Sequence, residues 1–178
     1  MGFRNFEGFN QALLAKQAGR ILTSPNSLCS RVLKARYFKS GCFLTANCPK
    51  GASYTWRSIA HGRELLKKGL VYRIGDGASV NVWQDNWIPR SGLMRPLGHK
   101  SNTVVHKVGE LLLPDGGGWN VEKLNEIFFE RDVEDIVQIP VGRAGSGDYF
   151  AWNYTKNGLF SVKSAYHLKM QLKSRSET

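Results

Sequence analysis

The spacing of apolar residues changes near residue 70, and this change points to a mixed fold. Before that position, apolar residues recur at steps of three and four, which is the spacing of one face of an α-helix. The pattern predicts three helices, over residues 9–22, 26–37 and 54–68. Ser53 is expected to cap the third helix, and Gly69 is expected to end it.

After Gly69 the apolar residues alternate with a step of two, as in a β-strand. Residues 71–74 and 79–83 flank the Gly-rich segment 75–78, which predicts a β-hairpin. A second hairpin is predicted from residues 148–154 and 159–160, because an Asn-Gly pair lies between these two strand-like runs.

The remaining segments favour short helices and turns. A helix is predicted over residues 105–113, and Asn120 and Ser161 are expected to cap later helices. Residues 141–147 contain three glycines and predict a flexible linker. The later helices are expected over residues 121–130, 131–137 and 162–172. The predicted fold class is therefore α+β, mostly α-helical with two small β-hairpins.

Positive charge is concentrated in the first part of the chain. The 178 residues have a formal charge of +11 and a pI of about 9.8. Residues 1–100 contain 16 Lys and Arg against 4 Asp and Glu, whereas residues 101–178 contain 9 against 10. A basic region of this kind favours a polyanionic partner, with nucleic acid first and an anionic membrane surface second. A basic surface that is simply solvated is the third interpretation.

Basic side chains near the predicted second and third helices are the candidate nucleic-acid contacts. Lys and Arg neutralise phosphates, and neighbouring aromatic rings can stack on bases. For the aromatic residues Trp56, Tyr72, Trp83 and Trp87, a place in the core is the favoured interpretation. The candidate binding residues are Arg31, Lys34, Arg36, Arg57, Arg63, Lys67, Lys68 and Arg73.

The sequence gives little support to a catalytic or metal site. Residues 75–77 (Gly-Asp-Gly) lack the spacing of a phosphate-binding loop and favour a turn. Cys29, Cys42, Cys48 and His61 lack the close pairs of a zinc site, so free thiols are expected. Asp76, Asp85 and the acidic residues of the 130–135 segment could be imagined as metal ligands, but a solvated acidic surface is favoured. No cofactor, small-molecule substrate or catalytic residue is expected.

Location in the cell is constrained mainly by segments that are missing. An odd number of cysteines and the lack of an apolar leader argue against a secreted protein. No run of 18 apolar residues suggests a membrane span. The expectation is a nuclear or cytoplasmic protein with no membrane partner.

Several long motifs, in order, resemble plant LINE-type (non-LTR) retrotransposon reverse-transcriptase polyproteins. The similar segments are FNQALLAKQA (residues 9–18), VLKARYF (32–38), SYTWRSI (53–59), GDG (75–77) and WQDNWIP (83–89). Further along, Trp152, Gly158 and FSVKSAY (160–166) resemble the opening of the family's reverse-transcriptase zinc-binding domain. The family usually has Trp where this chain has Gly19, so Gly19→Trp or Gly19→Ala is expected to raise the melting temperature.

The resemblance implies a truncated fragment of a larger multidomain protein. In the family this region follows the polymerase core, and the Tyr-x-Asp-Asp motif that holds the catalytic metal ions is absent here. The zinc ligands of the family are not reached, so no metal site carries over. The implied domains are a basic post-polymerase helical and hairpin unit (1–98), a linker with short helices (99–147) and the incomplete start of the zinc-binding domain (148–178).

The function that follows is a non-catalytic fragment whose basic surface contacts RNA or DNA. Its other expected partner is the remainder of a retroelement polyprotein. A decayed open reading frame of retroelement origin, with no independent activity, is the alternative. An enzyme in its own right is a third hypothesis, which would require Asp76 and Asp85 to act in catalysis.

Overall fold

Helix caps explain where the helices of the chain begin. In the computed structural model, which describes residues 5–114, 117–143 and 145–176, Asn5 caps α1 (Phe6–Thr23) by accepting a hydrogen bond from the Gly8 N–H at 2.8 Å. Ser53 Oγ accepts from the Trp56 N–H at 3.2 Å and begins α3 (Tyr54–Gly69). The expected caps Asn120 and Ser161 also accept such bonds, so the predicted helix starts at residues 53, 120 and 161 are confirmed.

The chain divides into two units. The helical unit combines both ends of the sequence, residues 1–69 and 154–178, and the central unit is residues 70–153. These limits differ from the domain boundaries expected at residues 98 and 147. The difference arises because the last helix packs with the first one, so the helical unit is built from segments far apart in the sequence.

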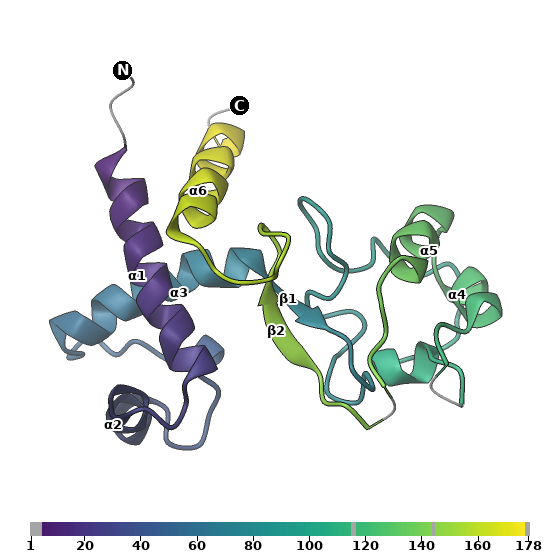
Figure 1. The fold of residues 1–178 in the computed structure, drawn as a ribbon, viewed down its shortest axis with the longest axis horizontal. Coiled ribbons are helices and arrows are strands. Elements are labelled where there is room, and N and C mark those ends of the chain that lie inside the picture. Colours follow the sequence, from purple (N-terminus) through teal and green to yellow (C-terminus); the bar gives the residue numbers. More distant parts are fainter. Residues whose placement is uncertain (1–4, 115–116, 144, 177–178) are drawn as a thin grey trace. The chain divides into compact units, whose positions relative to one another are not determined.

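The helical unit contains α1, α2 (Leu28–Tyr37), α3, α6 (Val162–Ser176) and a 3₁₀ turn at Phe43–Thr45. Helix α1 packs against α3 and α6, as Figure 1 shows. Its buried face consists largely of small residues, including Ala12, Ala15 and Ala18. A Cβ atom at Gly62 of α3 would overlap the backbone of α1 at Leu14 and Ala15. Small side chains on both helices therefore allow their backbones to approach closely.

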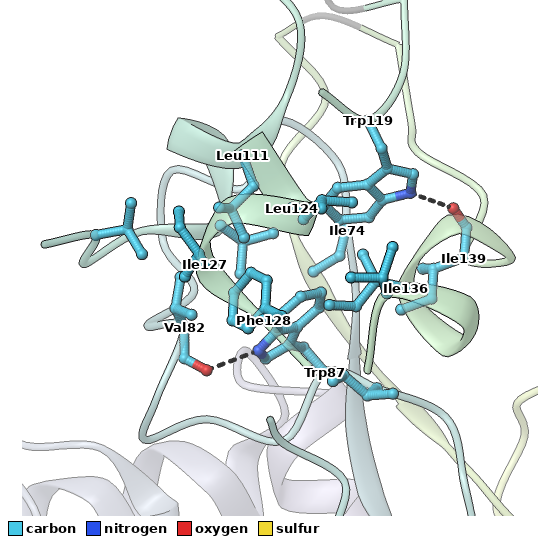
Figure 2. Close-up of a cluster of buried hydrophobic side chains, with 14 of the residues drawn as sticks. Ile74, Val82, Trp87, Leu111, Trp119, Leu124, Ile127, Phe128, Ile136 and Ile139 are labelled. Atoms are coloured by element: carbon cyan, nitrogen blue, oxygen red, sulfur yellow. Dashed lines mark hydrogen bonds between the residues drawn. The ribbon is translucent and has the colours of Figure 1, made fainter. Parts of the chain in front are cut away.

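The central unit is organised around a large apolar cluster, shown in Figure 2. Two buried indoles are anchored by hydrogen bonds: Trp87 Nε1 donates to Val82 O and Trp119 Nε1 donates to Ile139 O, both at 2.9 Å. Helices α4 (Val121–Ile127) and α5 (Glu130–Val137) and a 3₁₀ turn at Val108–Leu111 cover the cluster. Residues 99–147, expected as a linker, therefore supply much of a core.

The two strands that the structure describes pair with each other. Strand β1 (Leu70–Arg73) is antiparallel to β2 (Tyr149–Trp152), with Leu70 opposite Trp152 and Arg73 opposite Tyr149. The prediction of two separate hairpins is therefore wrong, although the predicted fold class, mostly α-helical α+β, is confirmed. Each predicted hairpin contributes only its first strand.

The second strand of each predicted hairpin has a different role. Val80 and Val82 are both buried, and their backbone bonds with residues 106–108: the Val82 N–H donates to His106 O, and the Val108 N–H donates to Val80 O. Around residues 155–159, Thr155 Oγ1 donates to Leu159 O at 2.7 Å, which closes a turn before α6. The Asn-Gly signal thus marks a real turn, but the segment after it enters a helix.

Candidate nucleic-acid interface

The division into units separates the charges more sharply than the division of the sequence at residue 100. The helical unit holds 17 Lys and Arg against 3 Asp and Glu, a formal charge of +14. The central unit holds 8 against 11, a formal charge of −3. The excess positive charge of the chain therefore belongs to one unit, because α6 adds its lysines to those of α1, α2 and α3.

Helix α2 presents three of the candidate residues to solvent. Arg31, Lys34 and Arg36 are exposed, whereas Ser30 and Leu33 face inward. Arg31 and Lys34 lie one turn apart, so both side chains can reach the same stretch of a polyanion. The Arg36 guanidinium lies over the ring of Tyr37, 5.6 Å from its centre. A cation on an aromatic face retains its positive charge for an incoming phosphate.

Helix α3 carries candidates with different surroundings. Arg57 and Lys68 are exposed on one face of the helix, and Glu64 lies between them on the same face. Lys67 Nζ is 3.4 Å from Glu64 Oε1, and the two side chains are 37% and 55% exposed. Such an exposed pair is weak and is screened by salt, so Lys67 remains available to a phosphate.

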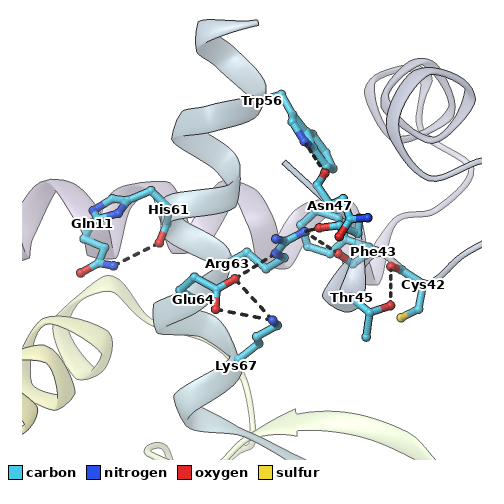
Figure 3. Close-up of polar contacts among 11 residues, drawn as sticks. Gln11, Cys42, Phe43, Thr45, Asn47, Trp56, His61, Arg63, Glu64 and Lys67 are labelled. Carbon is cyan, nitrogen blue, oxygen red and sulfur yellow. Dashed lines mark hydrogen bonds and ion pairs between the residues drawn. The ribbon is translucent and has the colours of Figure 1, made fainter. Parts of the chain in front are cut away.

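Arg63 is a structural residue, which corrects its prediction as a nucleic-acid contact. It is only 6% exposed, and its Nη1 donates to Phe43 O at 3.1 Å and to Ala46 O at 2.6 Å (Figure 3). Its Nε is also 3.3 Å from Glu64 Oε1. The guanidinium therefore satisfies two carbonyls of the 43–46 segment and fixes that segment on α3.

Arg73 is not part of the basic helical unit. It is the last residue of β1, in the central unit, and it is half-buried. The candidate set therefore divides into exposed residues of the helical unit, one buried residue and one residue of the other unit.

Sequence reasoning missed basic residues on α1 and α6. Lys16, Arg20 and Lys163 are exposed in the helical unit, although none of them was a candidate. Lys16 and Arg20 belong to the basic first part of the chain, whereas the signal at Lys163 was hidden because residues 101–178 are nearly neutral as a set. Only the structure assigns the acidic part of that set to the central unit and the basic α6 to the helical unit.

The Gly-Asp-Gly loop does have the geometry of an anion site, but the chain fills it with its own carboxylate. Asp148 Oδ1 accepts from the N–H groups of Gly75 and Gly77 at 2.8 and 2.9 Å, and Asp148 Oδ2 accepts from the N–H and hydroxyl of Ser79 at 3.0 and 2.7 Å. Partial burial raises the pKa of Asp148, but the Ser79 hydroxyl and the backbone N–H groups outweigh it, so the net pKa lies below its usual value. The loop is thus a structural clasp.

The acidic segment 130–135 is also partly structural. Asp132 is fully buried, and its Oδ1 lies 2.8 Å from Arg90 Nη1, which also pairs with Asp135 Oδ2 at 2.9 Å. Asp132 Oδ2 accepts from the Leu97 N–H. The expectation of a solvated acidic surface therefore holds for Glu130 and Glu134 and fails for Asp132.

Over residues 5–114, 117–143 and 145–176, no three His, Cys, Asp or Glu side chains come together in a way that could hold a metal ion. Cys29, Cys42 and Cys48 are free and exposed. Among the described helices, none has both the length and the apolar character needed to cross a bilayer.

The fold and site define a small α+β chain that consists of a basic helical unit and a mildly acidic central unit. The chain is similar to two proteins of Arabidopsis thaliana. It is 48% identical over 97 residues, 54% of this chain, to an uncharacterized mitochondrial protein. It is 32% identical over 181 aligned residues, 94% of this chain, to a protein named "putative ribonuclease H protein".

This chain spans only part of each of these relatives, 63% of the first and 28% of the second. No family model matches the sequence. No solved structure matches it either. The similarity thus relates the chain to segments of plant proteins.

Proposed function

We propose that this chain is a non-catalytic piece of a plant retroelement reverse-transcriptase polyprotein, and that its helical unit binds RNA or DNA through phosphates. The observation that carries the proposal is the formal charge of +14 on that unit, compared with −3 on the central unit. Exposed lysines and arginines that contact phosphates release condensed counterions, which supplies binding free energy without sequence preference.

The similarities to known proteins support this origin. The ordered motifs resemble plant non-LTR reverse-transcriptase polyproteins, and one relative from Arabidopsis thaliana bears a ribonuclease H name. Retroelement polyproteins act on RNA and DNA, so a basic segment within one would assist by holding a strand. The proposal assigns no chemistry to the chain. Asp148 is engaged in the clasp, and the two carboxylates of the enzyme hypothesis, Asp76 and Asp85, accept backbone hydrogen bonds from Ala78 and Asn81.

The test is the salt dependence of binding to a labelled oligonucleotide, followed by fluorescence anisotropy. The logarithm of the association constant should fall linearly with the logarithm of the salt concentration. The double variant Arg31→Gln/Lys34→Gln should weaken binding and reduce the slope by about 2, because each lost phosphate contact removes about one unit.

The matched control is Arg95→Gln/Lys100→Gln, which removes the same charge from exposed positions of the central unit. It should leave the slope unchanged. Equal effects of the two double variants would show that only net charge matters and would contradict a dedicated interface. A well-folded chain that binds no oligonucleotide at low salt would instead support the alternative, a decayed reading frame with no activity.

A further inference from the structure

A groove lies between α1 and α6 in the helical unit. It is lined by Phe9, Leu13, Val162, Lys163, Tyr166 and His167, and its volume is about 580 Å³. This volume falls within the range of sites that accept small organic groups. The groove is distinct from the candidate residues of α2 and α3.

The walls of the groove are aromatic and held in place. The rings of Phe9 and Tyr166 meet edge to face, with centroids 6.4 Å apart and an interplanar angle of 72°. The His167 ring is 6.0 Å from the ring of Tyr166. The Tyr166 hydroxyl accepts a hydrogen bond from the Asn5 N–H at 3.2 Å, which fixes the tyrosine side chain. A flat aromatic group could therefore enter a site that is already formed.

Positive charge continues from the groove along α1. Phe9, Leu13, Lys16 and Arg20 follow at steps of four, three and four, so they share one face of the helix. Lys16 and Arg20 are exposed, and Lys163 lines the groove itself. Glu7 lies two positions before Phe9 and therefore points to a different side of the helix. One face of α1 therefore carries part of the groove lining, Phe9 and Leu13, followed by two cations, Lys16 and Arg20.

We propose that this groove takes an unpaired base of single-stranded nucleic acid, while Lys163, Lys16 and Arg20 hold neighbouring phosphates. The inference rests on the proposed function and deepens it, because it names the strand form that the helical unit prefers. An aromatic site gains from stacking on an unpaired base, which is largely independent of sequence. A duplex keeps its bases stacked and paired, so it can use the cations but not the groove.

The experiment compares the full chain with variants that fill or discharge the groove. The probes are an oligothymidine, an oligouridine and a mixed-sequence DNA duplex of equal length. Leu13 is 41% exposed on the groove wall, so Leu13→Trp should fill the groove without a change in charge. It should weaken single-strand binding by about five- to tenfold, the equivalent of one stacked base, and leave duplex binding unchanged.

A second pair of variants separates the groove from general electrostatics. Lys163→Gln removes a charge at the groove, and Lys156→Gln removes one from an exposed position of the same unit that does not line it. Lys163→Gln should weaken single-strand binding more than Lys156→Gln. His167→Ala, at an exposed position, should also weaken only single-strand binding, and it serves if Leu13→Trp proves unfolded by circular dichroism.

The outcomes distinguish this inference from the proposed function. Salt-dependent binding with equal affinity for single strands and duplex, unaffected by Leu13→Trp and His167→Ala, would overturn the groove while the basic interface stands. No binding to any of the three probes would overturn the interface itself. If Leu13→Trp reduced the affinity for oligothymidine less than the affinity for oligouridine, RNA would be identified as the preferred strand.

Discussion

Arg57 and Arg63 lie six residues apart on α3 and have opposite environments. Arg57 is in solvent, whereas the Arg63 guanidinium donates to the carbonyls of Phe43 and Ala46. Position 63 lies two helical turns after the buried Trp56, so hydrophobic periodicity places it on the buried face of α3. The sequence does not reveal that the carbonyls of Phe43 and Ala46 lie within reach of its guanidinium. The same residue type therefore serves the fold at one position and remains free for a ligand at the other.

Substitution of Arg57 and of Arg63 should have opposite effects on the free energy of unfolding and on oligonucleotide affinity. Arg63→Gln should lower the free energy of unfolding by about 2–4 kcal/mol, because buried carbonyls lose a charged donor. It should not change the oligonucleotide affinity of the protein at a temperature where it remains folded. Arg57→Gln should do the reverse, with little effect on unfolding and weaker binding. Denaturant unfolding and anisotropy measure the two effects, and weaker binding by folded Arg63→Gln would contradict the structural role.

Asp148 links stability to pH. Its pKa is lowered in the folded chain, so its stabilising contribution is complete above the pKa of an unfolded Asp, near 4, and disappears as the pH falls through the lower folded value. Asp148→Asn should reduce the free energy of unfolding at neutral pH by about 1–2 kcal/mol. The difference between the variant and the natural chain should shrink as the pH falls below about 4. Denaturant titrations at several pH values test this, and a constant difference would show that the carboxylate's charge is not what the clasp uses.

At the scale of elements, the small-residue contact between α1 and α3 determines how closely these helices pack. The apolar spacing that predicts a helix over residues 9–22 comes from Phe9, Leu13, Leu14, Ala18, Ile21 and Leu22. Ala18 and Ile21 are buried, whereas Leu13 is exposed, and alanines form much of the buried face. Gln11 is buried as well, and its Nε2 donates to His61 O at 3.1 Å (Figure 3). A close helix crossing favours small residues, which hydrophobic spacing alone does not reveal.

Two glycines of this contact should respond in opposite ways to the same substitution. Gly19→Ala should raise the free energy of unfolding by about 0.5–1 kcal/mol, since alanine favours the helix and its Cβ would lie 3.9 Å from Leu66 Cδ1. Gly62→Ala should lower it by about 1–3 kcal/mol, because the added atom would overlap the α1 backbone. Thermal unfolding of both variants tests the crossing. If Gly62→Ala left the melting temperature unchanged, α1 and α3 would have to lie further apart than the structure shows. The higher melting temperature expected for Gly19→Trp stays a prediction.

Helix positions could be predicted from the sequence, and strand partners could not. Periodicity and caps at residues 53, 120 and 161 reflect local physics, so α3, α4 and α6 begin where expected. The pairing of β1 with β2 joins residues 76 to 82 positions apart, and nothing local distinguishes it from a hairpin. The Asp148 clasp is equally non-local, since it connects residues 75–79 to residue 148.

For the whole molecule, the return of α6 to α1 is what concentrates the charge. Residues 1–100 have a formal charge of +12 and residues 101–178 have −1, whereas the helical unit has +14 and the central unit has −3. The candidate residues on α2 and α3 were accessible to sequence reasoning because their lysines and arginines are local. The contribution of α6, and the groove between α1 and α6, depended on a contact between distant segments.

The central claim is that nucleic acid binds the helical unit and not the central unit. The most direct measurement is an NMR titration of the isotope-labelled full chain with a short oligonucleotide at low salt. The account predicts shifted amide resonances among residues 5–69 and 154–176, and resonances of residues 70–153 that remain in place. Shifts concentrated in residues 70–153, or spread evenly over both units, would contradict it.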